Sequence, residues 1–332
     1  MEPAPRHSPP MDLEAIMTLT HDDRQAVDRE IALRLQSDVA LINRLAGYII
    51  HSGGKRLRPL ILLLASRACG YQGSDHVGLA AIVEFIHTAT LLHDDVVDSS
   101  ELRRGQSTAN VVWGNEASVL VGDFLYSRAF EMMVDIRSMR VMEILSKATN
   151  TIAEGEVMQL LNCREPDIPE EHYLYVIRSK TAKLFEAAAR LGAVISGSDP
   201  DVEKALAAYG MHLGTAFQLI DDVLDYSADS TELGKNIGDD LAEGKPTLPL
   251  IHALRTGSPA QREMLRRALR EGGLSHIDEV LAAIESTGAI AYTARLAEDE
   301  AGRAVRALAA IPDSPHSRAL LDLAHLSVHR NH

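Results

Sequence analysis

The most informative feature of this chain is an acidic pattern that occurs twice. It consists of two aspartates, two aliphatic residues and a third aspartate, in Asp94-Asp95-Val96-Val97-Asp98 and in Asp221-Asp222-Val223-Leu224-Asp225. In a helix, which turns by about 100° per residue, the three carboxylates of each copy share one side. At ~5 Å separation and an effective dielectric of ~20, each like-charge pair costs about 3 kcal/mol. Such a surface needs a compensating cation.

The ligand chemistry of the two acidic motifs favours Mg²⁺. Clustered carboxylate oxygens suit a hard cation, and Mg²⁺ completes its coordination with water and phosphate oxygens. The two motifs therefore predict a clamp in which bridging ions hold a diphosphate. A solvated acidic helix end is the ordinary explanation for one such motif, but two copies with basic partners argue against it.

Basic residues accompany both acidic motifs. The segment Gly53-Gly54-Lys55-Arg56-Leu57-Arg58 places three cations at an expected helix start, where free backbone N–H groups also favour an oxyanion. The further basic candidates are Arg103, Arg104, Lys180, Lys235 and Lys245. A metal-held diphosphate is a leaving group, whereas a cation-held one belongs to a partner that stays intact. The pattern predicts condensation of two isoprenoid diphosphates.

Polar residues on two apolar helices extend these motifs. His87 lies about two turns before Asp94 on the same helix face, and Gln218 precedes Asp221 by three residues. A lone histidine in an apolar helix is more often a hydrogen-bonded core residue, so spacing alone leaves the role of His87 open. The polar stripe that includes Gln218 needs partners, which a metal ion and a diphosphate would supply.

Helical periodicity runs through almost the whole chain, and strand signals are nearly absent. The predicted helices lie near 12–18, 22–50, 58–70, 75–99, 116–138, 139–162, 169–196, 201–227, 246–256, 259–271, 275–286, 288–310 and 314–327. We expect a single all-α domain over residues 11–332, a large helical bundle, after a disordered proline-rich tail at residues 1–10. The polar segment 226–245 interrupts the pattern and predicts a functional lid.

Composition argues against several partners and locations. The net charge of −14 is unfavourable for binding nucleic acid. The longest apolar run, 59–65, is too short to cross a bilayer, and the N-terminal residues lack the apolar core of a signal peptide. The only two cysteines, Cys69 and Cys163, suit a reducing compartment. We therefore expect a cytoplasmic protein without a transmembrane segment.

Six segments together resemble the trans-polyprenyl diphosphate synthases. They are GGKRLRP (53–59), EFIHTATLLHDDVVDSSELRRG (84–105), GEVMQL (155–160), SKTAKLFEAAA (179–189), GTAFQLIDDVLDY (214–226) and GKNIGDDLAEGKPTLPL (234–250). The resemblance covers residues 11–330 and implies the isoprenoid synthase type of bundle, around a central cavity, in a homodimer. It also implies Mg²⁺, three ions per active site.

The implied reaction joins an allylic diphosphate, such as farnesyl diphosphate, to successive molecules of isopentenyl diphosphate. The resemblance implies a long all-trans product, octaprenyl diphosphate, for the side chain of a quinone. Solanesyl, decaprenyl and shorter geranylgeranyl products remain open. No side chain in the sequence is an obvious general base, so we expect the departing pyrophosphate to take the proton.

The resemblance implies a role for each matched residue. The metal ligands would be Asp94, Asp98 and Asp221, with Asp95, Asp222 and Asp225 around the same ions. Isopentenyl diphosphate would be held by Lys55, Arg58, His87 and Arg104. The allylic diphosphate would be contacted by Arg103, Lys180, Lys235 and Lys245. The allylic carbon would face the side chains of Thr181 and Gln218, whose oxygens can stabilise developing positive charge.

Product length would depend on the residues just before the first acidic motif. Thr90 lies one turn before Asp94 on the active face, while the place of Ala89 in a tunnel wall rests on the resemblance. Small residues at both positions would leave a channel open for the growing chain. The candidates for its floor are Phe130, Met132 and Met133, for which ordinary core packing is the competing explanation.

Two other functions fit a helical bundle with an acidic motif. A terpene cyclase typically lacks the second symmetric motif and the GGKRLRP cluster, and this chain has both. A non-catalytic subunit of a heteromeric synthase is expected to lose aspartates, and this chain keeps all six. The C-terminal residues 329–332 are assigned no role.

Overall fold

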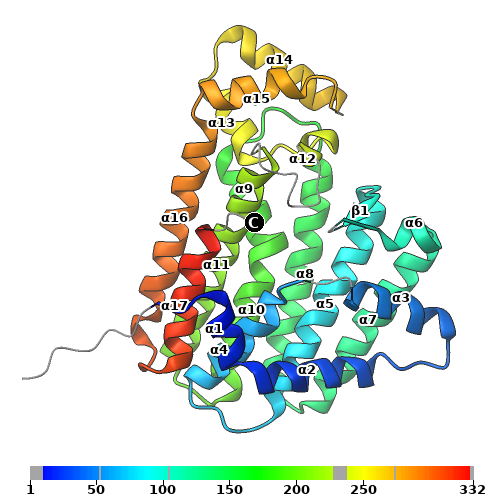
Figure 1. The fold of residues 1–332 in the computed structure, drawn as a ribbon, viewed down its shortest axis with the longest axis vertical. Coiled ribbons are helices and arrows are strands. Elements are labelled where there is room, and N and C mark those ends of the chain that lie inside the picture. Colours follow the sequence, from blue (N-terminus) through cyan, green and yellow to red (C-terminus); the bar gives the residue numbers. More distant parts are fainter. Residues whose placement is uncertain (1–9, 52–53, 104, 227–237, 273, 330–332) are drawn as a thin grey trace, which may run out of the picture.

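The structure is a computed structural model that describes residues 10–51, 54–103, 105–226, 238–272 and 274–329. These residues are almost entirely helical (Figure 1), which confirms the predicted all-α class. The helices are α1 (Leu13–Leu19), α2 (His21–Arg34), α3 (Ala40–His51), α4 (Leu57–Ala68), α5 (Asp75–Val97), α6 (Ala109–Trp113), α7 (Asn115–Asp135), α8 (Met139–Asn162), α9 (Glu170–Ile177), the π-helix η1 (Arg178–Ala182), α10 (Lys183–Ile195), α11 (Pro200–Asp225), α12 (Asp239–Ala242), α13 (Leu248–Thr256), α14 (Pro259–Glu271), α15 (Ile277–Ser286), α16 (Ala289–Ala307), the 3₁₀ helix η3 (Leu308–Ala310) and α17 (Pro315–Val328).

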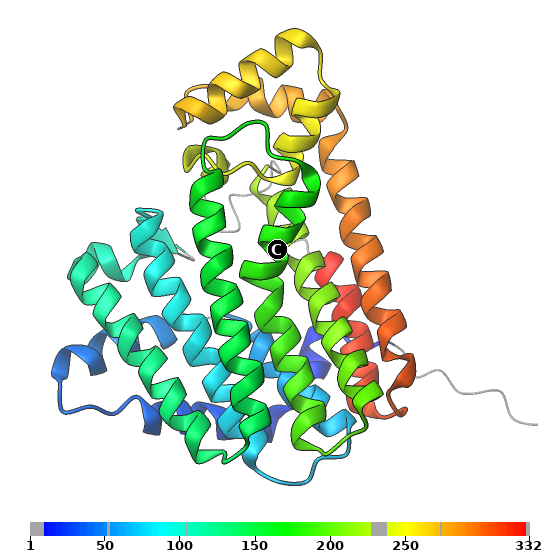
Figure 2. The ribbon, with the colours of Figure 1, turned by 180° about the vertical axis from the view of Figure 1, so that it is seen from behind.

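The long helices α5, α8, α10, α11 and α16 run side by side along the bundle (Figures 1 and 2). Helices α14 and α15 cover one end, at the top of Figure 1, and α2 crosses the other end. Helix α10 is central because it contacts α4, α5, α8 and α11. Its small residues allow this close packing: a Cβ added at Gly192 would lie 2.6 Å from the Cβ of Ala65.

The predicted helix 22–50 is two helices, α2 and α3, and this part of the prediction is wrong. The break at residues 35–39 is stabilised by side chains that replace backbone hydrogen bonds. The Ser37 amide donates to Asn43 Oδ1 at 3.0 Å, and Asn43 Nδ2 donates to the Ser37 carbonyl at 2.7 Å. Short polar side chains compete with the helical ladder in this way, although hydrophobic periodicity continues through the break.

Two short strands, β1 (Leu102–Arg103) and β2 (Gln106–Ser107), form an antiparallel hairpin after α5. Neither this hairpin nor the short helices α6 and α12 were predicted from the sequence. Each is five residues or fewer, too short to produce a periodic signal. The hairpin matters because β1 carries Arg103 back toward the end of α5.

Helix α5 is long and apolar enough to cross a membrane by length and composition, and it is the one such helix among the described residues. However, 67% of its apolar window is buried within the bundle. A core helix that is surrounded by other helices has this composition for packing reasons. The burial of α5 is therefore that of a core helix.

Some predictions fall on residues that the structure does not describe. They are the tail up to residue 9, Arg104, and most of the predicted lid, residues 227–237 with Lys235. The single-domain organisation of residues 11–332 also stays a prediction.

Candidate active site

Helices α5 and α11 bring the two acidic motifs to one cavity of about 440 Å³. The motifs occupy the C-terminal ends of their helices, where the backbone carbonyls already add partial negative charge. The cavity therefore has a strong demand for cations. The predicted site residues that line it are Arg58, His87, Thr90, Asp94, Asp98, Arg103, Lys180, Thr181, Gln218, Asp221, Asp225 and Lys245.

The three aspartates of each motif have two different environments. Asp94 and Asp98 line the cavity from α5, and Asp221 and Asp225 line it from α11. The middle aspartates, Asp95 and Asp222, are each only 1% exposed and lie behind this surface. Helical geometry explains the division because the first and last positions are about 40° apart, whereas the middle one is turned by about 100°.

Each carboxylate of the first motif forms an ion pair with a cation from a different element. The distances are 3.3 Å from Lys180 Nζ to Asp94 Oδ2, 2.6 Å from Arg103 Nη2 to Asp95 Oδ1, and 2.7 Å from Lys245 Nζ to Asp98 Oδ2. The two lysines also bind other acids, Lys180 to Glu156 at 2.6 Å and Lys245 to Glu243 at 2.5 Å. The basic residues predicted to hold a diphosphate therefore contact the predicted acidic motif.

The acidic surroundings keep both lysines charged. Burial lowers the pKa of Lys180, but the nearby Asp94 and Glu156 carboxylates outweigh it and raise the pKa above its ordinary value. The pKa of Lys245 is raised in the same way, because Asp98, Asp240 and Glu243 outweigh burial. Two permanent ammonium groups thus lie within the cavity wall.

Glu156 also lines the cavity, but the sequence predicted no role for it, although it lies in the segment GEVMQL (155–160). Burial raises the pKa of Glu156 to about 7, while Lys180 opposes the rise. Glu156 follows Gly155 and the exposed Glu154 on α8, so no sequence pattern distinguished it from an ordinary surface charge. Asp240 and Glu243, which also face Lys245, were not predicted either. Asp240 lies on the four-residue helix α12 and Glu243 directly follows it, and so short a helix gives no periodic signal.

Asp222 is held by side chains from two other positions. The Tyr173 hydroxyl donates to Asp222 Oδ2, and Gln218 Nε2 donates to Asp222 Oδ1 at 3.0 Å. Burial raises the pKa of Asp222 to about 7. No sequence signal indicated Tyr173, since an apolar helix with a tyrosine is common in protein cores.

The π-helix η1 places Lys180 and Thr181 in the cavity. Its extra residue per turn widens the helix, a feature that is frequent at functional sites. The Thr181 hydroxyl donates to Gln218 Oε1 at 3.0 Å, which connects η1 with α11. Two glycines allow η1 to approach its neighbours closely. A Cβ atom on Gly155 of α8 would lie only 2.7 Å from the Lys180 amide nitrogen, and a Cβ atom on Gly214 of α11 only 2.6 Å from Ala182 Cα.

The basic cluster at the start of α4 reaches the same cavity. Arg58 Nη1 lies 3.0 Å from His87 Nε2, and the Arg58 guanidinium stacks 4.5 Å from the centre of the Phe185 ring. Lys55 is exposed and lines an adjoining apolar pocket of about 250 Å³, which shares Phe217 with the main cavity. The structure thus places His87, whose role the spacing left open, beside Arg58 in the cavity wall.

The carboxylates of the cavity fit Mg²⁺ ions that are bound together with a diphosphate. Among residues 10–329, outside the gaps in the description, no three His, Cys, Asp or Glu side chains are arranged as a ready-made metal site. The acidic cavity donors are carboxylates: Asp94, Asp98, Glu156, Asp221, Asp225 and Asp240. This arrangement suits ions that are each held by one or two carboxylates, with phosphate and water oxygens completing the coordination.

A second cavity of about 810 Å³ extends from the first between α5, α7 and α8. The two cavities share Thr90, Asp94, Asp98, Ile152 and Glu156. Phe130, one candidate for the tunnel floor, lines the second cavity. Ala89, Met132 and Met133 are 0%, 2% and 0% exposed and pack in the adjacent apolar core. Their roles in product length stay predictions.

The sequence is similar to those of known polyprenyl diphosphate synthases. The family model described as polyprenyl synthetase matches residues 39–286. The chain is 56% identical to octaprenyl diphosphate synthase of Escherichia coli (strain K12), over 97% of this chain and 100% of that protein. It is 45% identical to an all-trans-nonaprenyl-diphosphate synthase of Rhodobacter capsulatus, over 95% and 97% of the two chains.

Solved structures show the same fold. A polyprenyl synthase from Caulobacter crescentus CB15, complexed with calcium and isoprenyl diphosphate, superposes with a TM-score of 0.93 at 47% identity. The alignment covers 97% of this chain and 98% of that one. A decaprenyl diphosphate synthase from Rhodobacter capsulatus superposes with a TM-score of 0.90 at 45% identity, over 96% and 98%. This chain is therefore a member of the polyprenyl synthetase family.

Proposed function

We propose that this protein is a Mg²⁺-dependent trans-prenyltransferase that condenses an allylic diphosphate with successive molecules of isopentenyl diphosphate. The observation that carries this proposal is the convergence of both acidic motifs, with lysines from two further elements, on one cavity. The presence of calcium and isoprenyl diphosphate in the Caulobacter crescentus structure supports a divalent ion and a diphosphate at this site.

The allylic diphosphate would bind between the two acidic motifs. Bound Mg²⁺ ions, which we expect to number three, supply charge neutralisation that makes the diphosphate a better leaving group. Lys180, Lys245 and Arg103 now contact the first motif and would donate to diphosphate oxygens instead. This exchange conserves charge pairing, and all three cations already line the cavity. Lys235, outside the described residues, is proposed as a further contact.

Breakage of the allylic C–O bond leaves positive charge on carbon and a pyrophosphate leaving group. Thr181 and Gln218 both line the cavity, where their side-chain oxygens would stabilise the charge on the allylic carbon. Apolar side chains in the wall, among them Phe217 and Leu184, would limit the access of water to the cation.

The second substrate, isopentenyl diphosphate, would be held by the basic cluster of Lys55, Arg58, His87 and Arg104, without metal. Its double bond attacks the allylic carbon and forms the new C–C bond. The product cation then loses a proton, which we assign to the departing pyrophosphate. The net change is one C–O bond broken, one C–C bond formed and one proton transferred.

The product would be a long all-trans chain, and octaprenyl diphosphate is our proposal. The second cavity supports a long product because it continues from the aspartates past Thr90 between α5, α7 and α8. Relatives at 45–56% identity carry the names octaprenyl and nonaprenyl diphosphate synthase. We propose that the product supplies the side chain of a quinone and that the enzyme acts in the cytoplasm.

A homodimer would explain the apolar residues exposed on α7 and α8. On α7 they include Leu120 and Val134, which are 66% and 61% exposed; on α8 they include Met139 and Leu161, which are 80% and 75% exposed. Large exposed apolar side chains on neighbouring helices are typical of an interaction surface. A second copy of the chain is the partner that we propose.

The direct test is to incubate the purified protein with farnesyl diphosphate, labelled isopentenyl diphosphate and Mg²⁺. After removal of the phosphates, the products are separated by chain length. We expect all-trans octaprenol as the main product. A solanesyl, decaprenyl or geranylgeranyl product would change the assigned length, whereas activity only in the presence of a second protein would identify a subunit of a heteromeric synthase. A cyclic hydrocarbon would contradict the proposal.

A further inference from the structure

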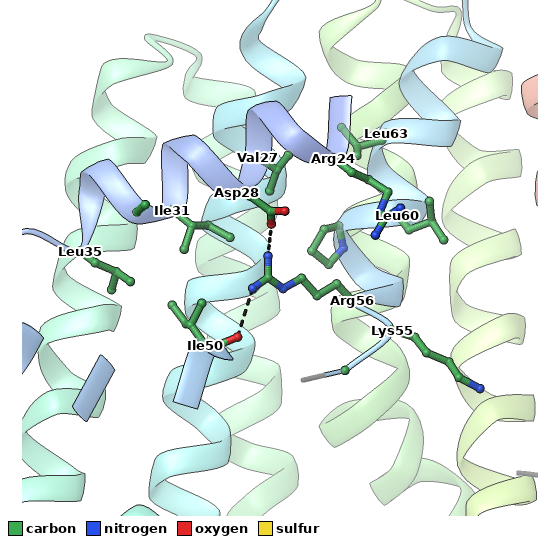
Figure 3. A pocket seen from close by; sticks show the side chains of 13 residues that line it. Arg24, Val27, Asp28, Ile31, Leu35, Ile50, Lys55, Arg56, Leu60 and Leu63 are labelled. Carbon is green, nitrogen blue, oxygen red and sulfur yellow. Dashed lines mark hydrogen bonds and ion pairs between the residues drawn. The ribbon is translucent and has the colours of Figure 1, made fainter. Parts of the chain in front are cut away.

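Arg56 lies in the basic cluster at the start of α4, but its side chain points away from the active site. Figure 3 shows Arg56 and Lys55 extending in different directions from adjacent positions. Arg56 has φ 44° and ψ 49°, the left-handed conformation that residues with a Cβ rarely adopt. Two residues later, Arg58 faces the cavity and contacts His87.

The Arg56 guanidinium contacts three helices that surround the start of α4. It forms an ion pair with Asp28 of α2, and its Nη2 donates to the Ile50 carbonyl near the end of α3 at 3.1 Å (Figure 3). Its Nε lies 3.7 Å from Glu84 Oε1 of α5, a residue that is only 8% exposed. Around these contacts is a separate pocket of about 420 Å³ with mainly aliphatic walls.

We propose that Arg56 is a positioning residue for isopentenyl diphosphate. Its fork-shaped side chain fixes the backbone where the loop becomes α4, so that Lys55 and Arg58, on either side of it, present their charges to the diphosphate. The inference rests on the proposed function, in which this basic cluster binds isopentenyl diphosphate.

The conformation of Arg56 is the physical reason for this role. A left-handed residue with a side chain is strained and persists only where its surroundings hold it. The contacts to Asp28, Ile50 and Glu84 supply that restraint. Without them the backbone would relax toward the right-handed region, and Lys55 would rotate relative to the axis of α4. An arginine suits this position because its planar fork can bind several oxygens at once.

The effect should be confined to one of the two substrates. The residues proposed for the allylic diphosphate, among them Lys180 and Lys245, lie on η1 and after α12. Within the part of the chain that the structure describes, the polar contacts of Arg56 are instead with α2, α3 and α5. A general loss of structure would impair both substrates, whereas a positioning role predicts impaired binding of isopentenyl diphosphate alone.

The test compares Arg56→Asn with Arg56→Lys. Asparagine tolerates the left-handed conformation but lacks the fork, and lysine keeps the charge near Glu84. KM is measured for each substrate with farnesyl diphosphate and labelled isopentenyl diphosphate, together with kcat and Tm. We expect KM for isopentenyl diphosphate to rise about tenfold in Arg56→Asn and about threefold in Arg56→Lys, with KM for farnesyl diphosphate within about twofold.

Two further variants make the result decisive. Arg24→Gln is the matched control, because Arg24 lines the same pocket but donates to the Met17 carbonyl of α1, and it should leave both KM values unchanged. Arg58→Gln tests the underlying site. If it leaves KM for isopentenyl diphosphate unchanged, the proposed binding cluster is wrong, and the role of Arg56 falls with it.

If Arg58→Gln raises KM for isopentenyl diphosphate but Arg56→Asn does not, only the positioning role of Arg56 is overturned. Equal increases in KM for both substrates would also overturn it, because they would indicate a general structural effect. Should Arg56→Asn fail to fold, Arg56→Lys decides the question: an unchanged KM for isopentenyl diphosphate contradicts the proposal.

Discussion

In each acidic motif the first and third aspartates face the cavity, whereas the middle aspartate is buried behind them. Asp94, Asp98, Asp221 and Asp225 face the cavity, where an incoming ion can reach their oxygens. Burial raises the pKa of Asp95, although the Arg103 guanidinium opposes the rise. The spacing of the motif predicted that the carboxylates share one side of the helix, but it did not predict which partners the middle positions would have.

Replacement of a cavity-facing aspartate should abolish most activity. We expect Asp94→Ala and Asp221→Ala each to lower kcat by about 10²–10³-fold or more, because each removes an oxygen ligand for the ions that neutralise the leaving group. Steady-state kinetics and circular dichroism measure the two consequences, and the fold should survive. Asp201→Ala is a matched control on α11, since that side chain is 91% exposed. Unchanged turnover in both cavity variants would contradict the clamp.

Thr90 should control the length of the product. It lines both cavities, and its hydroxyl donates to the His87 carbonyl at 2.8 Å. A phenylalanine there would obstruct the passage, so Thr90→Phe should shift the products to shorter chains. Ala89→Phe should also shorten them, but it would additionally cost about 1–3 kcal/mol of stability because Ala89 is fully buried.

Chromatography of the dephosphorylated products measures this effect. Thr90→Val, which nearly preserves the volume of the side chain, should retain the original chain length. An unaltered product distribution in Thr90→Phe would exclude this position from the path of the growing chain, and the same result in Ala89→Phe would exclude Ala89 from the channel wall.

At the scale of the elements, long periodic helices were predictable and local irregularities were not. The boundaries of α8 agree with the predicted 139–162, and α5 and α14 agree closely as well. The predicted helix 169–196 is interrupted by η1, whose wide turn depends on contacts with α8 and α11. A single sequence carries no record of such contacts. Residue types and spacing picked out the aspartates and basic residues that line the cavity, whereas their individual roles rest on the resemblance and stay predictions. Glu156 and Tyr173 were missed because their partners, Lys180 and Asp222, are distant in sequence.

Glu300 should stabilise the elements that carry the proposed allylic site. This residue of α16 is 1% exposed and binds Arg178 at 3.0 Å, His212 at 2.6 Å and Arg303 at 3.2 Å. Arg178 is the first residue of η1, and His212 belongs to α11, so the carboxylate connects both. Because the cations are partly exposed, we expect Glu300→Gln to lower the free energy of unfolding by about 1–3 kcal/mol.

The loss should depend on pH. Burial raises the pKa of Glu300, but His212, Arg178 and Arg303 outweigh it, so the folded pKa lies below the ordinary value of 4.5. A carboxyl with a depressed pKa stabilises the fold above its unfolded pKa and loses this contribution as pH falls through the folded pKa. Denaturant titrations should therefore show a difference between wild type and Glu300→Gln that is largest near neutral pH and narrows below about pH 4.5. A difference that grows on acidification would refute this account.

At the scale of the whole molecule, the apolar side chains on α7 and α8 predict a dimer. Leu161→Glu places a charge where the side chain is 75% exposed in the single chain and buried in the proposed dimer. We expect sedimentation analysis to show a dimer for wild type and a monomer for this variant. Leu33→Glu, at a position on α2 that is 58% exposed, should remain dimeric. A monomeric wild-type protein would rule out the proposed assembly.

The central claim is that two acidic motifs from opposite walls hold metal ions on one diphosphate. The most direct measurement is a crystal structure with a non-ionisable allylic diphosphate analogue and Mn²⁺ in place of Mg²⁺, in which anomalous scattering locates the ions. We predict ions that coordinate Asp94 and Asp98 on one side and Asp221 on the other, with the analogue's phosphate oxygens completing their coordination. Ions bound at one motif alone, or a diphosphate outside this cavity, would contradict the account.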